Sequence, residues 1–400
     1  MTVEDTTRLP CLRSVYPPVT MANRPLLMIP GPIEVSDGVR DAAAEAPRSH
    51  VAPDLVEAMG ASLQAMRHVW RAGEDAQPFI LAGSGSLAMD MATWNVIEPG
   101  ERVVVVNTGF FSDRSVEMLH RRGAHVTQVS AEPGDAPSID AVARSLDERP
   151  TAALFATHVD TSTGVRLDAE GLCRIARERN ILTVFDGVCA TGGERFEMDT
   201  WGADVYLTAS QKAIGLPPGL ALLVASPRAL ERRRALSVPP PMSLDWLEWL
   251  PVMTAYEARR PSYFATPATT LVWALRTGLD EILSADTDPG TAMDARVSAH
   301  AAVAGTFRAA WRDMGLELVP VSEALAANTL SAIRYPDGIG QELVSAIKER
   351  GVVVAPGLHP EFKDRYFRVG HMGDLITRPT DISRCIDAVS DAVQATRAAL

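Results

Sequence analysis

Short apolar segments alternate with helix-like stretches between residues 36 and 280, and this alternation constrains the fold more than any other feature. Six of these segments have the length and apolar content of buried strands. They read FILAG, RVVVVNT, ALFATH, LTVFDG, DVYLTA and LALLVAS. Stretches with helical periodicity, such as SDRSVEMLHRRG and DAEGLCRIARERN, separate them. Buried strands that alternate with helices are typical of a mostly parallel sheet with helices on both faces, so we expect an α/β fold.

A different pattern begins near residue 285. The long helical stretch SAHAAVAGTFRAAWRDMG is followed by expected strands near LELVP, TLSAIRY, VVVAP and YFRVGH and by a final helix. A chain of 400 residues, 46% of them hydrophobic, ordinarily divides into two domains. We therefore expect an N-terminal arm at residues 1–27, a large domain at 28–285 and a smaller C-terminal α+β domain at 286–400.

Composition excludes several classes of function. The net charge of −12, without a stripe rich in Lys and Arg, argues against a nucleic-acid partner. No segment approaches the roughly 18 consecutive apolar residues of a membrane span, and the first twenty residues lack the apolar core of a secretory signal. Cys11, Cys173, Cys189 and Cys385 show no CxxC spacing, which argues against a zinc site or a disulfide framework. We expect a cytoplasmic protein without a metal site.

Lys212 and Asp186 form the most informative pair in the chain. Lys212 lies in SQKAIGLPPG, directly after the expected strand DVYLTA, and Asp186 lies at the end of LTVFDG. An enzyme that uses pyridoxal 5'-phosphate requires such a pair, because the amine forms an imine with the cofactor and the carboxylate keeps the pyridine nitrogen protonated. Either residue alone is more often a solvated charge or a loop residue. Together, at the ends of two strands, they favour a cofactor site.

A Gly/Ser turn between a strand and a helix supplies a candidate phosphate site. The turn AGSGS contains Ser84, Gly85 and Ser86 and lies between the apolar QPFILA and the helix-like SLAMDMATWNVI. Backbone amides at a helix N-terminus and nearby hydroxyls bind anions, and glycine lets the backbone approach the ligand closely. The turn matches neither a P-loop nor a dinucleotide fingerprint. It is consistent with the phosphate of the same cofactor.

Arg368 lies within the apolar strand pattern of YFRVGHMG, where an unpaired guanidinium would be costly to bury. A carboxylate is the planar, bidentate partner that arginine fits best. The residues alone leave two partners open, a carboxylate of the protein and a carboxylate of a substrate.

Eight segments in order resemble the class V aminotransferases of fold type I, specifically the alanine–glyoxylate and serine–pyruvate branch. The matching segments read MIPGPIEV, QPFILAGSGS, NTGFFSDR, THVDTSTGV, FDGVCATGGE, LTASQKAIGLPPG, YFATP and FRVGHMG. They extend from about residue 28 to the last helix. The resemblance implies a large domain with a mostly parallel seven-stranded sheet covered by helices, and a smaller C-terminal domain.

The resemblance implies a role for each matched residue around the cofactor ring. Lys212 would bind pyridoxal 5'-phosphate covalently and later move a proton between the substrate and the cofactor. Asp186 would pair with the pyridinium, and Thr161 would hydrogen-bond the phenolic oxygen. Phe111 would stack on the ring, at a position where some relatives carry tryptophan.

The remaining roles concern the phosphate and the substrate. In the family, the positions that match Ser84, Gly85, Ser86 and Gln211 hold the phosphate. Those that match Tyr263 and Thr266 reach the phosphate of the neighbouring subunit, which implies a homodimer with shared active sites. Those that match Gly31 and Arg368 face the substrate.

The implied reaction is a ping-pong transamination from a small L-amino acid, alanine first, to glyoxylate, giving pyruvate and glycine. A serine–glyoxylate or serine–pyruvate enzyme is the close alternative, and a lyase-type class V enzyme or a non-enzymatic cofactor-binding module is more distant.

A cysteine desulfurase would need a mobile, exposed cysteine, whereas Cys385 lies on a helical apolar face and Cys189 on an expected buried turn. His50, His158 and His371 lie in or near matched segments without metal-site spacing, and we assign them no catalytic role.

Overall fold

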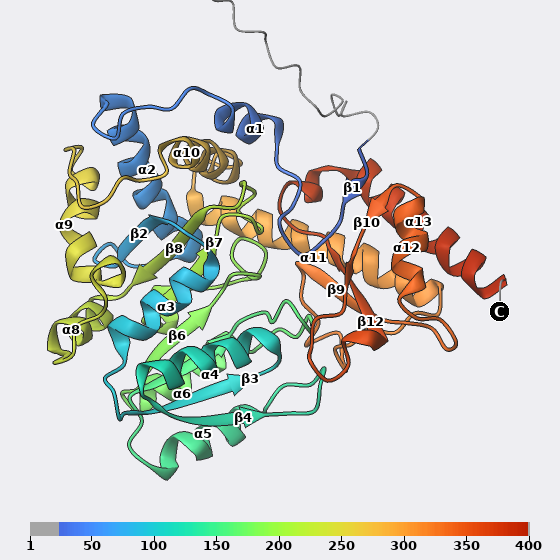
Figure 1. Ribbon diagram of the computed structural model, residues 1–400, viewed down its shortest axis with the longest axis horizontal. Coiled ribbons are helices and arrows are strands. Elements are labelled where there is room, and N and C mark those ends of the chain that lie inside the picture. Colours follow the sequence, from blue (N-terminus) through green and yellow to red (C-terminus); the bar gives the residue numbers. More distant parts are fainter. Residues whose placement is uncertain (1–23, 399–400) are drawn as a thin grey trace, which may run out of the picture.

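The computed structural model describes residues 24–398 (Figure 1), so most of the expected N-terminal arm lies outside the described residues. A seven-stranded sheet forms the centre of the larger part, with strand order β2-β8-β7-β6-β5-β3-β4. The strands are β2 (Gln77–Ala82), β3 (Arg102–Asn107), β4 (His125–Ser130), β5 (Ala153–Thr157), β6 (Leu182–Asp186), β7 (Val205–Ala209) and β8 (Leu220–Ala225). The expected mostly parallel α/β sheet is confirmed.

Strand direction determines which loops meet. β4, β3, β5, β6 and β7 are parallel to one another, whereas β8 is antiparallel to both of its neighbours, β7 and β2. Because β8 runs antiparallel to both, β2 points the same way as β7. The segments that follow β2, β3, β5, β6 and β7 therefore leave the sheet at one edge, where ligands bind in folds of this type.

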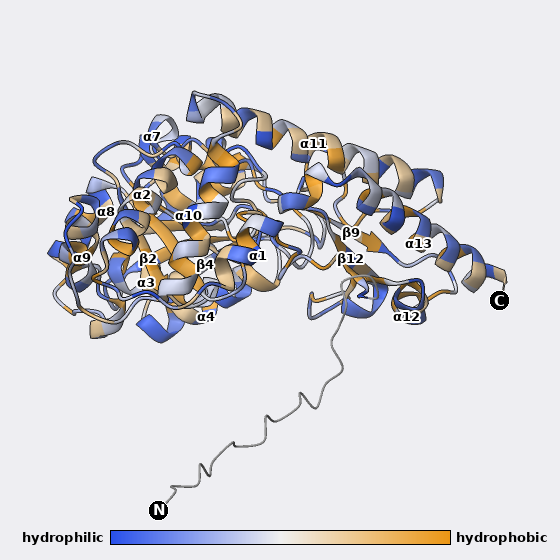
Figure 2. Cartoon of the chain, turned by 90° about the horizontal axis from the view of Figure 1, so that it is seen from above, coloured by the Kyte–Doolittle hydropathy of each residue, from blue (hydrophilic) through white to orange (hydrophobic). Residues whose placement is uncertain are grey.

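Helices cover the sheet, and Figure 1 shows α3 and α4 in front of it. The helices of this part are α1 (Asp37–Ala43), α2 (Pro53–Trp70), α3 (Gly85–Val96), α4 (Phe110–Arg122), α5 (Ile139–Glu148), α6 (Ala169–Glu178), α7 (Met198–Trp201), α8 (Pro227–Ala235), α9 (Trp246–Glu257) and α10 (Thr269–Leu283). The strands are almost entirely apolar and buried, except β4. In Figure 2, the outer helices carry many hydrophilic residues, drawn in blue. One continuous apolar core fills the space between sheet and helices.

The C-terminal part has its own core and is joined to the larger part by the long helix α11 (Pro289–Asp313) (Figures 1 and 2). Its antiparallel sheet has the order β11-β12-β9, and a separate parallel pair joins β1 to β10. The elements are β1 (Leu26–Leu27), β9 (Leu330–Arg334), α12 (Glu342–Glu349), β10 (Val352–Val353), β11 (Ala355–Pro356), β12 (Tyr366–Gly370) and α13 (Pro379–Ala398).

The structure corrects two expectations about individual segments and suggests a change to the domain bounds. β4 was not among the six expected strands, because this edge strand has no buried residue and so no apolar run. The segment LELVP forms only an isolated bridge from Leu318 to Ile333. Leu26 and Leu27, assigned to the arm, pair with β10, so we propose that the C-terminal domain includes them together with residues 286–400.

Within residues 24–398, no helix combines the length and the apolar character that crossing a bilayer would need.

The core of the larger part gives a direct test of the packing. Phe79 in β2 is fully buried and stacks on Trp246 with ring centroids 5.9 Å apart. Phe79→Ala should lower the free energy of unfolding by about 3–5 kcal/mol, because the substitution leaves a cavity. Val238, which is 43% exposed, provides the control, and Val238→Ala should change it by less than about 0.5 kcal/mol. Urea denaturation of both variants would contradict this packing if the two losses were equal.

Candidate active site

The shared edge of the sheet brings most of the expected site residues together. Lys212 follows β7, Asp186 ends β6, and Thr161 lies in the turn after β5. Phe111 lies in the first turn of α4, directly after β3. The turn with Ser84, Gly85 and Ser86 connects β2 to α3.

Lys212 lies in a buried environment, with only 7% of its surface exposed. Its Nζ donates a hydrogen bond to the carbonyl of Pro30. Burial lowers the pKa of the Lys212 amine, and the positive charge of Arg368 lowers it further, while Cys189 and Asp186 oppose the shift. The effect is to favour the neutral amine, which is the nucleophilic form.

Gly31 leaves room for the Lys212 side chain. A Cβ atom built on Gly31 would lie 2.6 Å from Cδ and 2.9 Å from Nζ of Lys212. Gly31 also has a φ of +102°, a conformation that side chains rarely adopt. The backbone at Gly31 therefore forms one wall of the space around the amine.

Asp186 is also buried, and its Oδ1 accepts a hydrogen bond of 2.8 Å from the Val188 amide. Burial raises the pKa of the Asp186 carboxyl to about 7, although this hydrogen bond, Lys212 and Arg114 lower it. The Asp186 carboxylate forms no ion pair with a Lys, Arg or His side chain of the described residues. A cationic ring nitrogen beside it would be such a partner.

The N-terminus of α3 provides free backbone donors. Ser84 precedes the helix without a side-chain cap, and Ser86 Oγ accepts a hydrogen bond of 3.1 Å from Arg114 Nη1. A Cβ on Gly85 would lie 2.9 Å from Val188, so close packing requires glycine there. Gln211, next to Lys212, has a buried side-chain oxygen without a hydrogen-bond partner. Helix dipole, hydroxyls and Arg114 together suit an anion.

The turn after β5 connects the N-terminus of α4 to the C-terminal sheet. Asp160 is fully buried and accepts hydrogen bonds from the Phe111 amide at 3.2 Å and the Ser162 amide at 2.9 Å. The Thr161 carbonyl accepts a bond of 3.1 Å from Arg368 Nη1. Asp160 and Arg114 are candidate site residues that sequence reasoning missed, although both lie inside matched segments, THVDTSTGV and NTGFFSDR.

Arg368 lies in β12 with 8% of its surface exposed. Its Nε donates to the Pro356 carbonyl at 2.9 Å, and it forms no ion pair with a carboxylate of residues 24–398. Burial lowers the pKa of the guanidinium. Its Nη2 donors make no hydrogen bond to the described protein atoms, so a carboxylate from outside the chain could complete its bonding.

Tyr263 and Thr266 lie on the surface between α9 and α10. Tyr263 is 61% exposed, and its hydroxyl is 3.3 Å from Thr266 Oγ1. Thr266 borders an apolar cavity of about 220 Å³ that Ala82 and Leu87 also line. Neither residue contacts Lys212 or Asp186 through a hydrogen bond within this chain.

The histidines in matched segments have structural partners. His158 Nδ1 lies 2.8 Å from the Tyr206 hydroxyl, and Ser331 Oγ lies 3.0 Å from His371 Nε2. Burial lowers the pKa of both imidazoles to about 3, so both are neutral. Burial also raises the pKa of the Cys189 thiol, which disfavours the thiolate. Among residues 24–398, no cluster of His, Cys, Asp and Glu could hold a metal ion.

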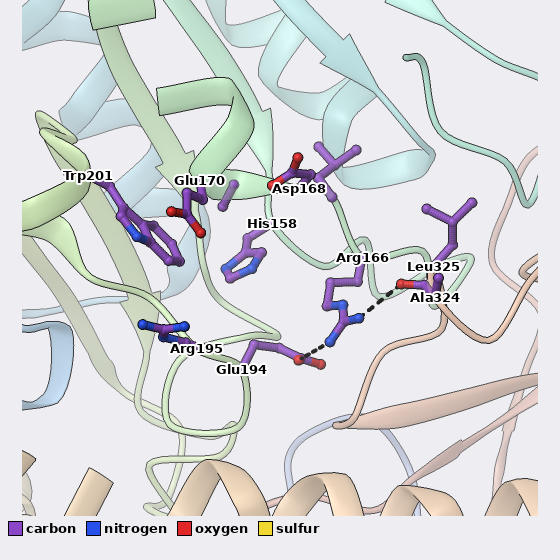
Figure 3. A pocket seen from close by; sticks show the side chains of 11 residues that line it. His158, Arg166, Asp168, Glu170, Glu194, Arg195, Trp201, Ala324 and Leu325 are labelled. Atoms are coloured by element: carbon purple, nitrogen blue, oxygen red, sulfur yellow. Dashed lines mark hydrogen bonds and ion pairs between the residues drawn. The ribbon is translucent and has the colours of Figure 1, made fainter. Parts of the chain in front are cut away.

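A second pocket, of about 390 Å³, lies beside His158, which directly follows β5 (Figure 3). In it, Arg166 Nη1 lies 3.1 Å from the buried Glu194 carboxylate, and Nη2 donates to the Ala324 carbonyl at 2.9 Å. Glu194 also accepts a hydrogen bond of 2.9 Å from Asn328 Nδ2. These bonds attach the segment that precedes β9 to the larger part, which fixes the C-terminal sheet beside the crevice.

The raised pKa of Asp186 predicts how stability depends on pH in the cofactor-free protein. The pKa of an aspartate side chain is ordinarily 3.8 and that of Asp186 is about 7, so over this range the folded state retains a proton that the unfolded state loses. Between these values, stability falls as pH rises. Asp186→Asn removes this loss, so its melting temperature should rise relative to wild type from pH 4 to pH 7 and then stay level. A difference that did not change with pH would contradict the assignment.

Comparisons with known proteins agree with this geometry. The family model described as Aminotransferase class-V matches residues 48–359. Alanine–glyoxylate aminotransferase 1 of Saccharomyces cerevisiae is 34% identical over 92% of this chain and 97% of its own length. The L-aspartate–glyoxylate aminotransferase of Paracoccus denitrificans is 29% identical over 89% of this chain and 88% of its own.

Comparison with solved structures also finds glyoxylate aminotransferases. The crystal structure of an alanine–glyoxylate aminotransferase from Nostoc sp. superposes with a TM-score of 0.86, at 27% identity, and covers 98% of this chain and 100% of that one. The expected fold type I architecture is thereby confirmed, as is the resemblance on which it was based. The chain belongs to the aminotransferase class-V family.

Proposed function

We propose that this protein is a pyridoxal 5'-phosphate-dependent transaminase that moves the amino group of a small L-amino acid, alanine first, to glyoxylate. The products are pyruvate and glycine. The observation that carries the proposal is the buried Lys212 amine, with its lowered pKa, at the end of the strand next to Asp186. A lowered pKa favours the neutral lysine amine, which can form a covalent bond with an aldehyde, and an adjacent carboxylate can hold a protonated ring nitrogen.

The residues present fit the cofactor. The amides at the N-terminus of α3, with the hydroxyls of Ser84 and Ser86 and the side-chain NH2 group of Gln211 as donors, suit its phosphate. The proposed Phe111 contact supplies an aromatic face, and Thr161 a hydroxyl for the phenolic oxygen. When bound, the cofactor supplies the electron sink and carries the amino group between the two half reactions.

Side chains of this chain perform the proton steps. Lys212 Nζ, once free, would take the proton from the substrate Cα and later return it, as general base and acid. The Pro30 carbonyl, which accepts the Nζ hydrogen bond, would orient the amine between these two steps. Asp186 would keep the ring nitrogen protonated, because its carboxylate regains full charge beside a cation.

The substrate side of the site favours a small monocarboxylic donor. Arg368 is buried without a carboxylate partner and would bind the α-carboxylate. The backbone at Gly31 closes the space near Lys212. Two donors of Arg368 are bonded to backbone carbonyls, so the remaining donors would bind one carboxylate but not a second, side-chain carboxylate. The yeast relative's name supports alanine and glyoxylate.

Two alternatives have particular support. Serine is close to alanine in size, so a serine–glyoxylate or serine–pyruvate enzyme would use the same residues. The name of the Paracoccus relative supports aspartate as donor, with glyoxylate again as acceptor. A lyase-type class V enzyme with another amino substrate would share Lys212 but would not need an oxo-acid acceptor.

The test of this function uses the purified enzyme loaded with cofactor. L-Alanine should quickly shift the visible absorption of the bound cofactor, and glyoxylate should restore it. L-Serine and L-aspartate are compared under the same conditions, and Lys212→Ala is the control that should give no catalytic cycle. An enzyme that binds cofactor but responds to no amino acid would refute transamination. A faster response to aspartate would refute the preference for small donors.

We further propose a homodimer in which Tyr263 and Thr266 reach the phosphate of the partner subunit. Both are polar, mutually close and exposed in the single chain. The exposure of Tyr263 between α9 and α10 fits a surface that a second copy of the chain would cover.

Complementation tests the shared sites. Lys212→Ala and the double variant Tyr263→Ala/Thr266→Ala should each have low activity, because each lacks one half of every site. After unfolding and refolding together, mixed dimers contain one site with both halves intact, so about a quarter of wild-type activity should return. Activity of the mixture equal to the sum of the separate variants would contradict sites shared between subunits.

A further inference from the structure

We propose that Asp160 is a positioning residue that sets the cofactor ring and the substrate carboxylate relative to each other. The inference rests on the proposed function. Asp160 itself lies outside the contacts proposed for cofactor and substrate, because its two carboxylate oxygens are already bound by donors of the protein. Its effect would pass through Phe111, Thr161 and Arg368.

The Asp160 carboxylate joins two segments that are far apart in the sequence. Oδ2 accepts hydrogen bonds from the Phe111 and Ser112 amides at 3.2 and 3.3 Å, at the N-terminus of α4. Oδ1 accepts from the Ser162 amide at 2.9 Å and from Ser162 Oγ at 2.6 Å. The Phe110 amide in turn donates to Ser162 Oγ at 3.1 Å. The aromatic residue proposed for stacking is thereby fixed to the turn that contains Thr161.

The same turn holds the substrate side of the site through two carbonyls. The Thr161 carbonyl accepts from Arg368 Nη1 at 3.1 Å, and the Ser162 carbonyl accepts from the Tyr366 hydroxyl at 2.5 Å. Arg368 and Tyr366 both belong to β12 of the C-terminal part. One turn therefore connects Phe111 with the guanidinium, and the carboxylate of Asp160 fixes that turn.

The hydrogen-bond donors at this site favour a carboxylate, because they lower the pKa of Asp160 against the rise that burial causes. Every group that contacts Asp160 Oδ1 or Oδ2 is a donor, and the side chain is fully buried. An asparagine would turn its amide hydrogens toward donors on one side, which breaks bonds to that segment. Gly109 adds a steric constraint, because a Cβ there would lie 2.4 Å from Ser162 Oγ. The two segments approach so closely that loss of the carboxylate should shift them.

The experiment compares Asp160→Asn with Asp204→Asn in the full-length enzyme. Asp204 is the control for loss of a buried carboxylate away from the site: it is 3% exposed, accepts a hydrogen bond of 2.9 Å from the Thr183 amide and pairs with Arg228, but lies at the opposite edge of the sheet, just before β7. Both variants should lose stability. Asp160→Asn alone should raise the cofactor dissociation constant and the KM for L-alanine, each by about tenfold, the loss expected for a disturbed charged hydrogen bond.

The outcomes separate the proposal from its alternatives. A variant with lower stability but unchanged dissociation constant and KM would show that Asp160 is only structural. Equal effects of Asp204→Asn would show that the losses reflect general destabilisation. If Asp160→Asn does not fold, Ser162→Ala removes one donor and should move both constants in the same direction, and unchanged constants would overturn the proposal. If wild type binds cofactor but reacts with no amino acid, the proposed function fails, while the dissociation constant still tests Asp160.

Discussion

The burial of positive charge without a matching carboxylate is the constraint on which the rest of the site depends. Lys212 and Arg368 are each less than a tenth exposed, and each donates hydrogen bonds to backbone carbonyls rather than to acids. Burying such groups is costly unless they are neutralised or paired. For Lys212, burial lowers the pKa of the amine and so favours loss of its proton. Arginine cannot lose its proton near neutral pH, so Arg368 favours an anionic ligand instead.

Strand direction then determines which side chains can act together. Parallel strands deliver their following loops to one edge, and the antiparallel β8 restores that direction for β2. A single antiparallel strand thus allows the Gly/Ser turn after β2 to lie at the same edge as Lys212. Sequence reasoning identified both strands from their apolar residues, but an apolar run carries no information about direction, so this part of the topology could not be predicted.

Other strands and site residues were predicted, or missed, according to whether the sequence itself reveals that they are buried. Strands β3, β5 and β6 were predicted because burial on both faces produces continuous apolar runs, whereas β4 lies at an edge and shows none. Lys212 and Asp186 were recognised because their types carry the chemistry directly. Asp160 was not, because a carboxylate in a turn looks like a solvated loop residue. Only the fold shows that it is fully buried and surrounded by donors.

The position of Arg368 links substrate choice to the arrangement of the two parts. The guanidinium lies in the C-terminal sheet but donates to the turn after β5, and the pair of Arg166 and Glu194 attaches the preceding segment to the same region. A substrate carboxylate would bind between the two parts, with its Cα held toward Lys212. Because Arg368 already donates hydrogen bonds to the carbonyls of Pro356 and Thr161, its remaining donors can bind only one carboxylate. A dicarboxylic donor would carry a second charge that Arg368 could not also bind, a cost that a small uncharged side chain avoids.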